Sequence, residues 1–121
     1  MAVGAFGALV PFVPGGQDFG KSRELFRELG FEEQWANDGY VGFIGGAARF
    51  ILQDLNNPQF ARNLMIKIEV PDLDAWWAHV STRDLPMRFA GVRLRPPTDF
   101  PWGREVHLID LAGVCWHVGL P

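Results

Sequence analysis

The sequence has 121 residues, 48% of them hydrophobic, and a formal net charge of −3 at pH 7. This length and composition are typical of one globular domain, and we treat residues 1–121 as a single domain. The negative charge argues against a nucleic-acid binder, which usually carries a basic face, and it favours a cationic small ligand. The single cysteine, Cys115, and the lack of a signal-like segment or an apolar run of about 18 residues favour a soluble protein of the cytoplasm.

The first half of the chain, approximately residues 1–56, predicts a strand, a helix and three further strands. The first strand ends near Val13. Asp18 begins the helix, because its carboxylate accepts hydrogen bonds from free N–H groups of the first turn, which stabilises a helix by about 1 kcal/mol. Gly30 ends it, since glycine readily adopts the left-handed conformation found there. The helix has an apolar stripe of Phe19, Leu25, Phe26 and Leu29, and the three strands cover 33–37, 40–44 and 49–54, with turns at 37–39 and 45–46 that suit hairpins.

The second half, approximately residues 62–121, repeats this order after a linker that begins at Asn56. A strand over 64–70 leads to a helix that Asp72 caps in the same way as Asp18. The helix has an apolar stripe of Leu73, Trp76, Trp77 and Val80, and the strands that follow cover 87–95, 104–110 and 114–118. The sequence therefore predicts an α+β fold of two βαβββ modules that form curved mixed sheets.

Alternation of residue types predicts which face of three strands packs against the helices. In each strand one set of side chains points toward the helices, and the other set points into an open cavity. The residues expected on the helix side are Phe50, Leu52, Leu64, Ile66, Ile68, Val70, Val114, Trp116 and Val118. The residues expected on the cavity side are Arg49, Ile51, Gln53, Met65, Lys67, Glu69, Cys115 and His117.

Four segments resemble the bleomycin resistance proteins of the vicinal oxygen chelate superfamily, which also holds glyoxalase I and the fosfomycin-modifying enzymes. They are SRELFRELGF, DGYVGFIGG, KIEVPDLDAWWAHV and PWGREVHLIDLAGVCWHV. One departure is the last turn, where the family usually has Asp-Pro-x-Gly-Asn and this chain has DLAGV from Asp110, so we expect a slightly looser turn. The resemblance implies a domain-swapped homodimer that exchanges its first strand, and the Gly- and Pro-rich start supplies the flexibility for that exchange.

The resemblance also locates the metal ligands of the superfamily's enzymes, which lie on the first, fourth, fifth and eighth strands. The matching positions here are Val10 or Pro11, Ile51, Met65 and His117. Only His117 offers a donor atom, whereas an open catalytic site needs about three protein ligands. We therefore expect no metal, no cofactor and no metal-dependent lyase, dioxygenase or thiol-transferase activity.

Other chemistry has weaker support from the sequence. Cys115 and His117 share one strand face, but no acid that would orient the histidine is identifiable, so nucleophilic catalysis is disfavoured. We interpret His79 and His107 as structural, hydrogen-bonded residues.

Aromatic residues near two loops suggest a binding groove. Trp35 and Tyr40 flank the first hairpin turn, and Trp102 lies in a loop rich in proline and glycine. Trp102 either caps the core or contacts a ligand. The resemblance implies that these three residues stack on the planar, cationic end of a bleomycin-type drug, with Trp102 supplied by the second subunit. Asp38 is either a carboxylate partner for ligand amines or a plain turn residue.

The sequence thus predicts a non-catalytic homodimer that sequesters a bleomycin-type antibiotic in grooves at the dimer interface and so confers resistance. The remaining expected ligand-binding residues are Arg49, Gln53, Met65, Lys67, Gly103, Cys115 and His117. Two alternatives stay open. Arg49 and Lys67 would repel a polycation unless a carboxylate pairs with them, which favours another aromatic metabolite. A metal-dependent enzyme of the glyoxalase or dioxygenase kind would need displaced ligands such as His117, Gln53 and Glu69.

Overall fold

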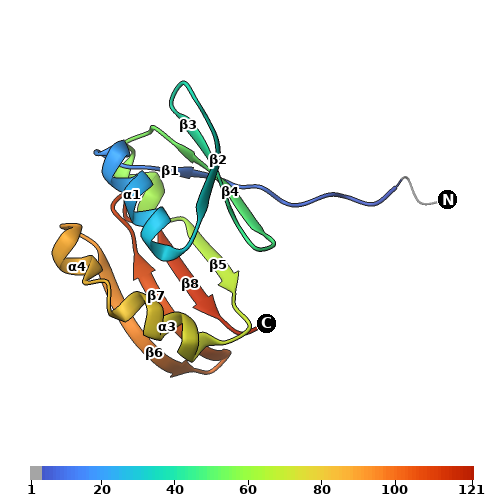
Figure 1. The fold of residues 1–121 in the computed structure, drawn as a ribbon, viewed down its shortest axis with the longest axis vertical. Helices are drawn as coiled ribbons and strands as arrows, with labels where there is room; N and C mark the ends of the chain where they lie inside the picture. Colours follow the sequence, from blue (N-terminus) through green and yellow to red (C-terminus); the bar gives the residue numbers. More distant parts are fainter. Residues whose placement is uncertain (1–3) are drawn as a thin grey trace.

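Two βαβββ modules make up the computed structural model, which describes residues 4–121 (Figure 1). Within this range the predicted α+β fold is confirmed. The first module contains β1 (Phe12–Pro14), α1 (Phe19–Leu29), β2 (Glu32–Asn37), β3 (Tyr40–Gly45) and β4 (Ala48–Gln53). After α2 (Pro58–Arg62), the second module contains β5 (Met65–Glu69), α3 (Leu73–Ser81), α4 (Leu85–Arg88), β6 (Arg93–Phe100), β7 (Gly103–Ile109) and β8 (Cys115–Gly119).

Each module forms a four-stranded mixed sheet with the same strand order. The orders are β1-β4-β3-β2 and β5-β8-β7-β6. The first strand of each module pairs in parallel with the last, and the other neighbours are antiparallel. In each module the last three strands pair antiparallel with their neighbours in sequence. The pairing register therefore shows which residues of different strands share one face of the sheet.

The predicted helix caps are confirmed. A carboxylate oxygen of Asp18 accepts a hydrogen bond from the backbone N–H of Lys21 at 3.1 Å, and Asp72 does the same for Ala75 at 3.0 Å. Gly30 follows α1 with a φ of 114°, in the left-handed region that glycine favours. The two modules therefore begin their long helices by the same local device, as the sequence indicates.

The helix-facing sides of both sheets meet in one hydrophobic core. Phe26 of α1 is at the centre, with its ring centroid 4.9 Å from that of Phe50 in β4 and 5.3 Å from that of Trp116 in β8. The predicted alternation is confirmed, because Phe50, Leu52, Trp116 and Val118 are buried while the side chains expected on the other face are more exposed. These are Arg49, Ile51, Gln53, Cys115 and His117. Since both inner faces contribute to one core, the opposite face of each sheet points away from it. We call these the first and second open faces.

Two expected segments differ from the structure. The strand predicted over 87–95 begins inside α4, which ends at Arg88, and β6 starts only at Arg93. The strand then continues through Pro96 and Pro97, which were expected in a loop. Proline is tolerated there because β6 is an edge strand, and its pairing with β7 shifts between Arg95 and Thr98.

The linker between the modules also contains a short helix, α2, that the sequence analysis did not predict. Asn57 caps it by accepting a hydrogen bond from the backbone N–H of Phe60 at 3.1 Å, and Pro58 occupies its first turn.

The N-terminal arm, residues 4–11, contains no helix or strand and extends away from the rest of the molecule (Figure 1). Its side chains Phe6 and Leu9 are fully exposed. The strand that follows, β1, pairs with β4 of its own chain. Exchange of this strand between two copies stays a prediction. In the described part of the chain, no helix combines the length and the apolar character that a membrane crossing requires.

Candidate functional site

The first open face carries Trp35, Tyr40, Arg49 and Gln53, as the sequence analysis expected for the two strand residues. Trp35 is paired with Gly42 across β2 and β3, and its indole lies directly over that glycine. A Cβ atom at residue 42 would be 2.1 Å from the indole Nε1, so only glycine leaves room for the ring. The indole is 44% exposed and therefore presents a flat surface to solvent.

A second aromatic pair extends this face toward β1. The rings of Phe12 and Tyr40 are in edge contact with centroids 6.1 Å apart, and both side chains are exposed. Gln53 lies opposite Tyr40 in the β3–β4 pairing and belongs to the same face. Asp38 lies in the hairpin turn with a φ of 37°, a conformation that aspartate tolerates in tight turns. The first open face is therefore mainly aromatic, with polar groups at its margins.

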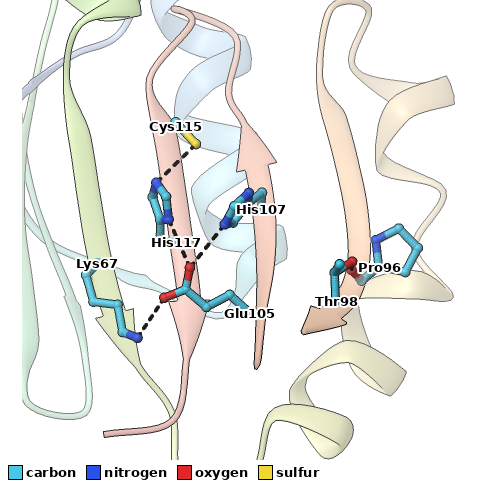
Figure 2. A network of polar contacts seen from close by, with 7 residues as sticks. All are labelled: Lys67, Pro96, Thr98, Glu105, His107, Cys115 and His117. Carbon is cyan, nitrogen blue, oxygen red and sulfur yellow. Dashed lines mark hydrogen bonds and ion pairs between the residues drawn. The ribbon is translucent and has the colours of Figure 1, made fainter. Parts of the chain in front are cut away.

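The second open face holds a connected polar network (Figure 2). Met65 and Lys67 of β5 lie beside Cys115 and His117 of β8, as predicted. At the centre is Glu105 of β7, which is buried although it carries a carboxylate. Lys67 donates from Nζ to Glu105 Oε2 at 2.8 Å, and two imidazole nitrogens, His107 Nε2 and His117 Nδ1, lie 3.1 and 3.0 Å from Glu105 Oε1.

The network keeps Glu105 ionised. Burial alone would raise the pKa of this carboxyl group, but contacts from Lys67, Trp102, His117 and His107 outweigh burial and hold its pKa well below the usual range. An ionised carboxylate only accepts hydrogen bonds, so both histidine nitrogens that face it carry protons. In this tautomer His117 presents its other nitrogen, Nε2, toward the Cys115 sulfur 3.5 Å away.

The Cys115 thiol is not activated by this contact. Burial and the nearby carboxylates of Glu105 and Asp110 raise its pKa above the ordinary value. A nucleophilic cysteine needs the opposite shift, because the thiolate is the reactive form. This direction of the pKa shift disfavours a nucleophilic role for Cys115.

Trp102 lies at the end of an aromatic stack on the second open face. Its ring is parallel to that of Phe100 with centroids 5.0 Å apart, and Phe100 stacks in turn on the imidazole of His107 at 4.6 Å. The guanidinium of Arg95 lies 5.4 Å from the Phe100 ring centroid. Trp102 is 65% exposed, which excludes its role as a buried plug of the core and leaves its outer surface accessible. Gly103 follows it at the start of β7.

The predicted site residues therefore form two separate groups in one chain. Trp35, Tyr40, Arg49 and Gln53 belong to the first open face, with Asp38 at its hairpin. Met65, Lys67, Cys115 and His117 belong to the second, with Trp102 and Gly103 at its hairpin. Because the two faces point away from the shared core, one chain does not place the first group opposite the second.

Sequence reasoning missed Glu105, Phe100 and the true setting of His107. The sequence spacing could have indicated that the two histidines meet. His107 and His117 each lie five positions from Ala112, in the turn that joins β7 to β8. Antiparallel pairing about that turn brings the two histidines opposite each other, and Glu105, two residues earlier, lies on the same face. His107 was read as an isolated structural residue because this pairing was not used.

The structure places further potential donor atoms beside His117, which the ligand count from the sequence did not include. That count considered only the four positions that bind metal in the superfamily, and the residues there do not fit an ion, since His117 is the one donor among them. The structure brings two donors from β7 to that histidine. One ligand atom from each of Glu105, His107 and His117 lies within 4.8 Å of the others.

A cavity of about 510 Å³ lies elsewhere, on the helix side of the sheets between the two modules. Phe31, Trp76 and Trp116 supply much of its aromatic wall, and Ile68 and His79 also line it. None of the predicted ligand-binding residues contributes to it.

Comparisons with known proteins identify the fold. Neither family patterns nor curated protein sequences give a match. A bleomycin-binding protein from bleomycin-producing Streptomyces verticillus, solved with copper(II)-bleomycin, has a TM-score of 0.79 at 24% identity, and the match covers 98% of this chain and 99% of that one. The bleomycin resistance determinant encoded on transposon Tn5 has a TM-score of 0.77 at 18% identity, covering 93% and 96% of the two chains.

More distant structures share the same architecture. The fosfomycin resistance protein FosX from Listeria monocytogenes, solved with Mn(II) and sulfate, has a TM-score of 0.69 at 13% identity and covers 94% of this chain and 89% of its own. Structures with this architecture thus include drug-binding proteins and a protein solved with a metal ion. The chain has the fold found in these bleomycin-binding and bleomycin resistance proteins.

Proposed function

We propose that this protein binds a bleomycin-type antibiotic without altering it chemically and lowers the free drug concentration in the cytoplasm. The observation that carries the proposal is the exposure of flat aromatic surfaces on both open faces, by Trp35 and Tyr40 on one and Trp102 on the other. Such surfaces attract a planar cationic group through stacking and cation–π interactions worth about 1–2 kcal/mol each when water is excluded. Affinity alone suffices for protection when protein exceeds drug.

We propose further that a homodimer assembles the complete groove. The two groups of aromatic residues belong to faces that point away from one core, so a second copy is needed to set Trp102 opposite Trp35 and Tyr40. The extended arm supports this arrangement, because the fully exposed Phe6 and Leu9 gain burial when they pack on a partner.

The charge of the second open face is compatible with a cationic ligand. Lys67 and Arg49 were the two charges expected to repel a polycation, and the ammonium group of Lys67 is paired with Glu105 at 2.8 Å. On the second open face the positive charge of Lys67 is therefore balanced by the carboxylate of Glu105, beside two histidines. The net charge of −3 adds a weak general attraction for a cation.

The test is a titration of the protein with bleomycin, followed by tryptophan fluorescence. We expect saturable quenching at micromolar drug, with one equivalent bound per chain, and a loss of affinity of roughly tenfold in Trp102→Ala, because removal of one desolvated stacking surface costs about 1–2 kcal/mol. Trp77→Phe is the matched control, because Trp77 lies on α3 and packs on the helix side of the second sheet. Quenching that does not saturate, or equal binding by Trp102→Ala and wild type, would contradict the proposal.

Oligomeric state is tested by sedimentation equilibrium of the full chain and of a variant that lacks residues 4–11. We expect a dimer for the full chain and weaker association for the variant. A monomer that binds drug with undiminished affinity would exclude the shared groove.

A further inference from the structure

We propose that Glu105, His107 and His117 form a binding site for one divalent transition-metal ion, of which Zn²⁺ is the best match. The site lies on β7 and β8 of a single chain, and its donors differ from the superfamily's positions on the first, fourth and fifth strands. The inference goes beyond drug binding and does not depend on it.

The three donor atoms already converge on one point. His107 Nε2 and His117 Nδ1 both face Glu105 Oε1, at 3.1 and 3.0 Å. Zinc bonds to nitrogen and oxygen are about 2.0–2.2 Å long, so two ligands of one tetrahedral ion lie roughly 3.3 to 3.6 Å apart. All three donor atoms lie within 4.8 Å of one another. Small side-chain adjustments would therefore bring them to the spacing that an ion requires. Two imidazoles and one carboxylate are ligands that Zn²⁺ accepts, and the fourth position is free for water.

The surrounding residues hold the donors in place. His107 and His117 are directly paired across β7 and β8, so backbone hydrogen bonding fixes the spacing of the two imidazoles. Phe100 stacks on one face of His107 with an interplanar angle of 12°. Lys67 occupies Glu105 Oε2 and leaves Oε1 for the ion. The strand pairing and the ring stacking orient the two imidazoles, and loss of such contacts usually weakens metal binding. Lys67 differs, because its positive charge opposes a cation beside it.

Coordination requires a different tautomer of each histidine from the one that faces Glu105. A neutral His117 that coordinates through Nδ1 carries its proton on Nε2, where the Cys115 sulfur, 3.5 Å away, accepts it weakly. His107 coordinates through Nε2 and carries its proton on Nδ1. Each imidazole changes its tautomer by proton exchange with water, so no net proton is released. The histidine side chains are 17% and 20% exposed, so an ion reaches them from the open face.

The test uses untagged, metal-free full-length protein without drug. Isothermal titration with Zn²⁺ is expected to show one ion per chain, and Co²⁺ is expected to give the visible absorption bands of a tetrahedral site. His107→Gln and His117→Gln should each weaken Zn²⁺ binding by more than roughly 100-fold. Loss of a residue that only supports a metal ligand costs roughly 10–100-fold, and loss of a ligand itself costs more. His79→Gln is the matched control, because His79 lies on α3 in the wall of the separate cavity.

The results that would overturn the site are absence of a stoichiometric ion, or equal weakening by His79→Gln and His107→Gln. If the histidine variants do not fold, Lys67→Met supplies an independent test. Loss of the ammonium group removes a positive charge 2.8 Å from the Glu105 carboxylate, so Zn²⁺ is expected to bind several-fold more tightly. Unchanged or weaker binding in that variant would contradict the site. Because no drug is present, a negative result here leaves the proposed drug binding unaffected.

Discussion

The two modules follow the same chain path but use different chemistry on both sides of their sheets. In the first, four phenylalanines at 26, 31, 43 and 50 pack face to face and edge to face in the core, and the open face presents Trp35, Phe12 and Tyr40. In the second, buried carboxylates at Asp110 and Glu105 organise the turn and the open face. The same topology therefore supports one apolar face and one polar face.

A groove formed between two copies of the chain would combine the properties of both open faces. An aromatic face supplies contact area with little directional preference, whereas a network of fixed hydrogen bonds selects the orientation of polar groups. A ligand held between the first open face of one copy and the second open face of another would meet both. The predictions below test whether the modules differ as described, from the largest expected effect to the smallest.

The largest effect is expected from Phe50→Ala, which removes a ring of the core that the two modules share. Phe50 is buried and contacts Phe26 and Trp116, the latter at 5.2 Å. We expect a loss of about 3–5 kcal/mol in the free energy of unfolding, as is usual when a large aromatic residue is truncated in a core. Urea denaturation followed by tryptophan fluorescence and by circular dichroism measures it. The two signals should change together, because Trp116 belongs to the second module. Separate transitions would show that the modules are independent.

A smaller loss is expected from Asp110→Asn in the second module. One carboxylate oxygen of Asp110 accepts the backbone N–H groups of Ala112, Gly113 and Val114, each at 3.0 Å, and the other accepts the Trp116 indole N–H at 2.8 Å. An asparagine side chain keeps one acceptor oxygen, but its NH₂ group replaces the other oxygen and then faces a donor N–H group. We expect a loss of about 1–3 kcal/mol, the usual cost of an unsatisfied buried group.

Denaturant unfolding of Asp110→Asn beside Asp99→Asn measures this cost, since Asp99 is exposed on β6. Equal stabilities for the two variants would mean that the turn does not depend on this carboxylate. The sequence predicted a slightly looser turn after Asp110 than is usual in the family. Three backbone N–H groups that donate to one Asp110 oxygen indicate instead a well-ordered turn, and this comparison of stabilities tests it.

Much of the fold was predictable because local rules and tertiary packing agree. Asp18 and Asp72 as helix caps, Gly30 as a terminator and the alternation in β5 and β8 all follow from patterns within one element. The Pro96–Pro97 segment was misread because proline usually opposes a strand, and the tolerance of an edge position depends on the sheet order. Strand order is set by contacts between distant segments.

The candidate site was predictable only in part, for a related reason. The face of each strand follows from alternation, so Lys67 and His117 were placed correctly. The partner of Lys67 was not, because Glu105 is distant in sequence and reaches Lys67 across β8. Trp35 was recognised as an aromatic residue near a turn, but its dependence on Gly42 appears only when the two strands are paired.

That dependence gives a prediction for the first open face. Gly42→Ala places a Cβ atom 2.1 Å from the Trp35 Nε1 and must displace the indole. Overpacking costs about 1–3 kcal/mol in a closed core, and we expect the lower end, about 1 kcal/mol, because Trp35 can swing outward. Drug affinity should fall together with a red shift of tryptophan emission. Gly20→Ala in α1 is the control, since its added Cβ meets only an Asp18 oxygen at 3.7 Å. Unchanged emission in Gly42→Ala would show that Trp35 does not lie over this glycine.

The smallest effect concerns the ion pairs that join the modules and is best seen as a pH dependence. Glu28 of α1 accepts hydrogen bonds from Arg83 at 2.7 Å and Arg88 at 2.9 Å, both in the second module. These contacts, Arg88 first, lower the pKa of Glu28 from 4.5 to about 2. A carboxyl group with a depressed pKa in the folded state stabilises the fold above its unfolded pKa, and this stabilisation is lost as pH falls from about 4.5 through about 2.

Glu28→Gln should therefore be less stable than wild type at pH 6 by roughly 0.2–1 kcal/mol, the range for partly exposed pairs, and the difference should shrink toward zero as pH approaches 2. Urea denaturation of wild type and variant at several pH values measures the two free energies of unfolding. The other carboxyl groups titrate in both proteins, so their contributions cancel in the difference. Glu32→Gln is the control, because Glu32 is an exposed residue at the start of β2 in the first module. A difference that is constant with pH would mean that Glu28 joins the modules by packing, and the two halves would then be held together by the aromatic core alone.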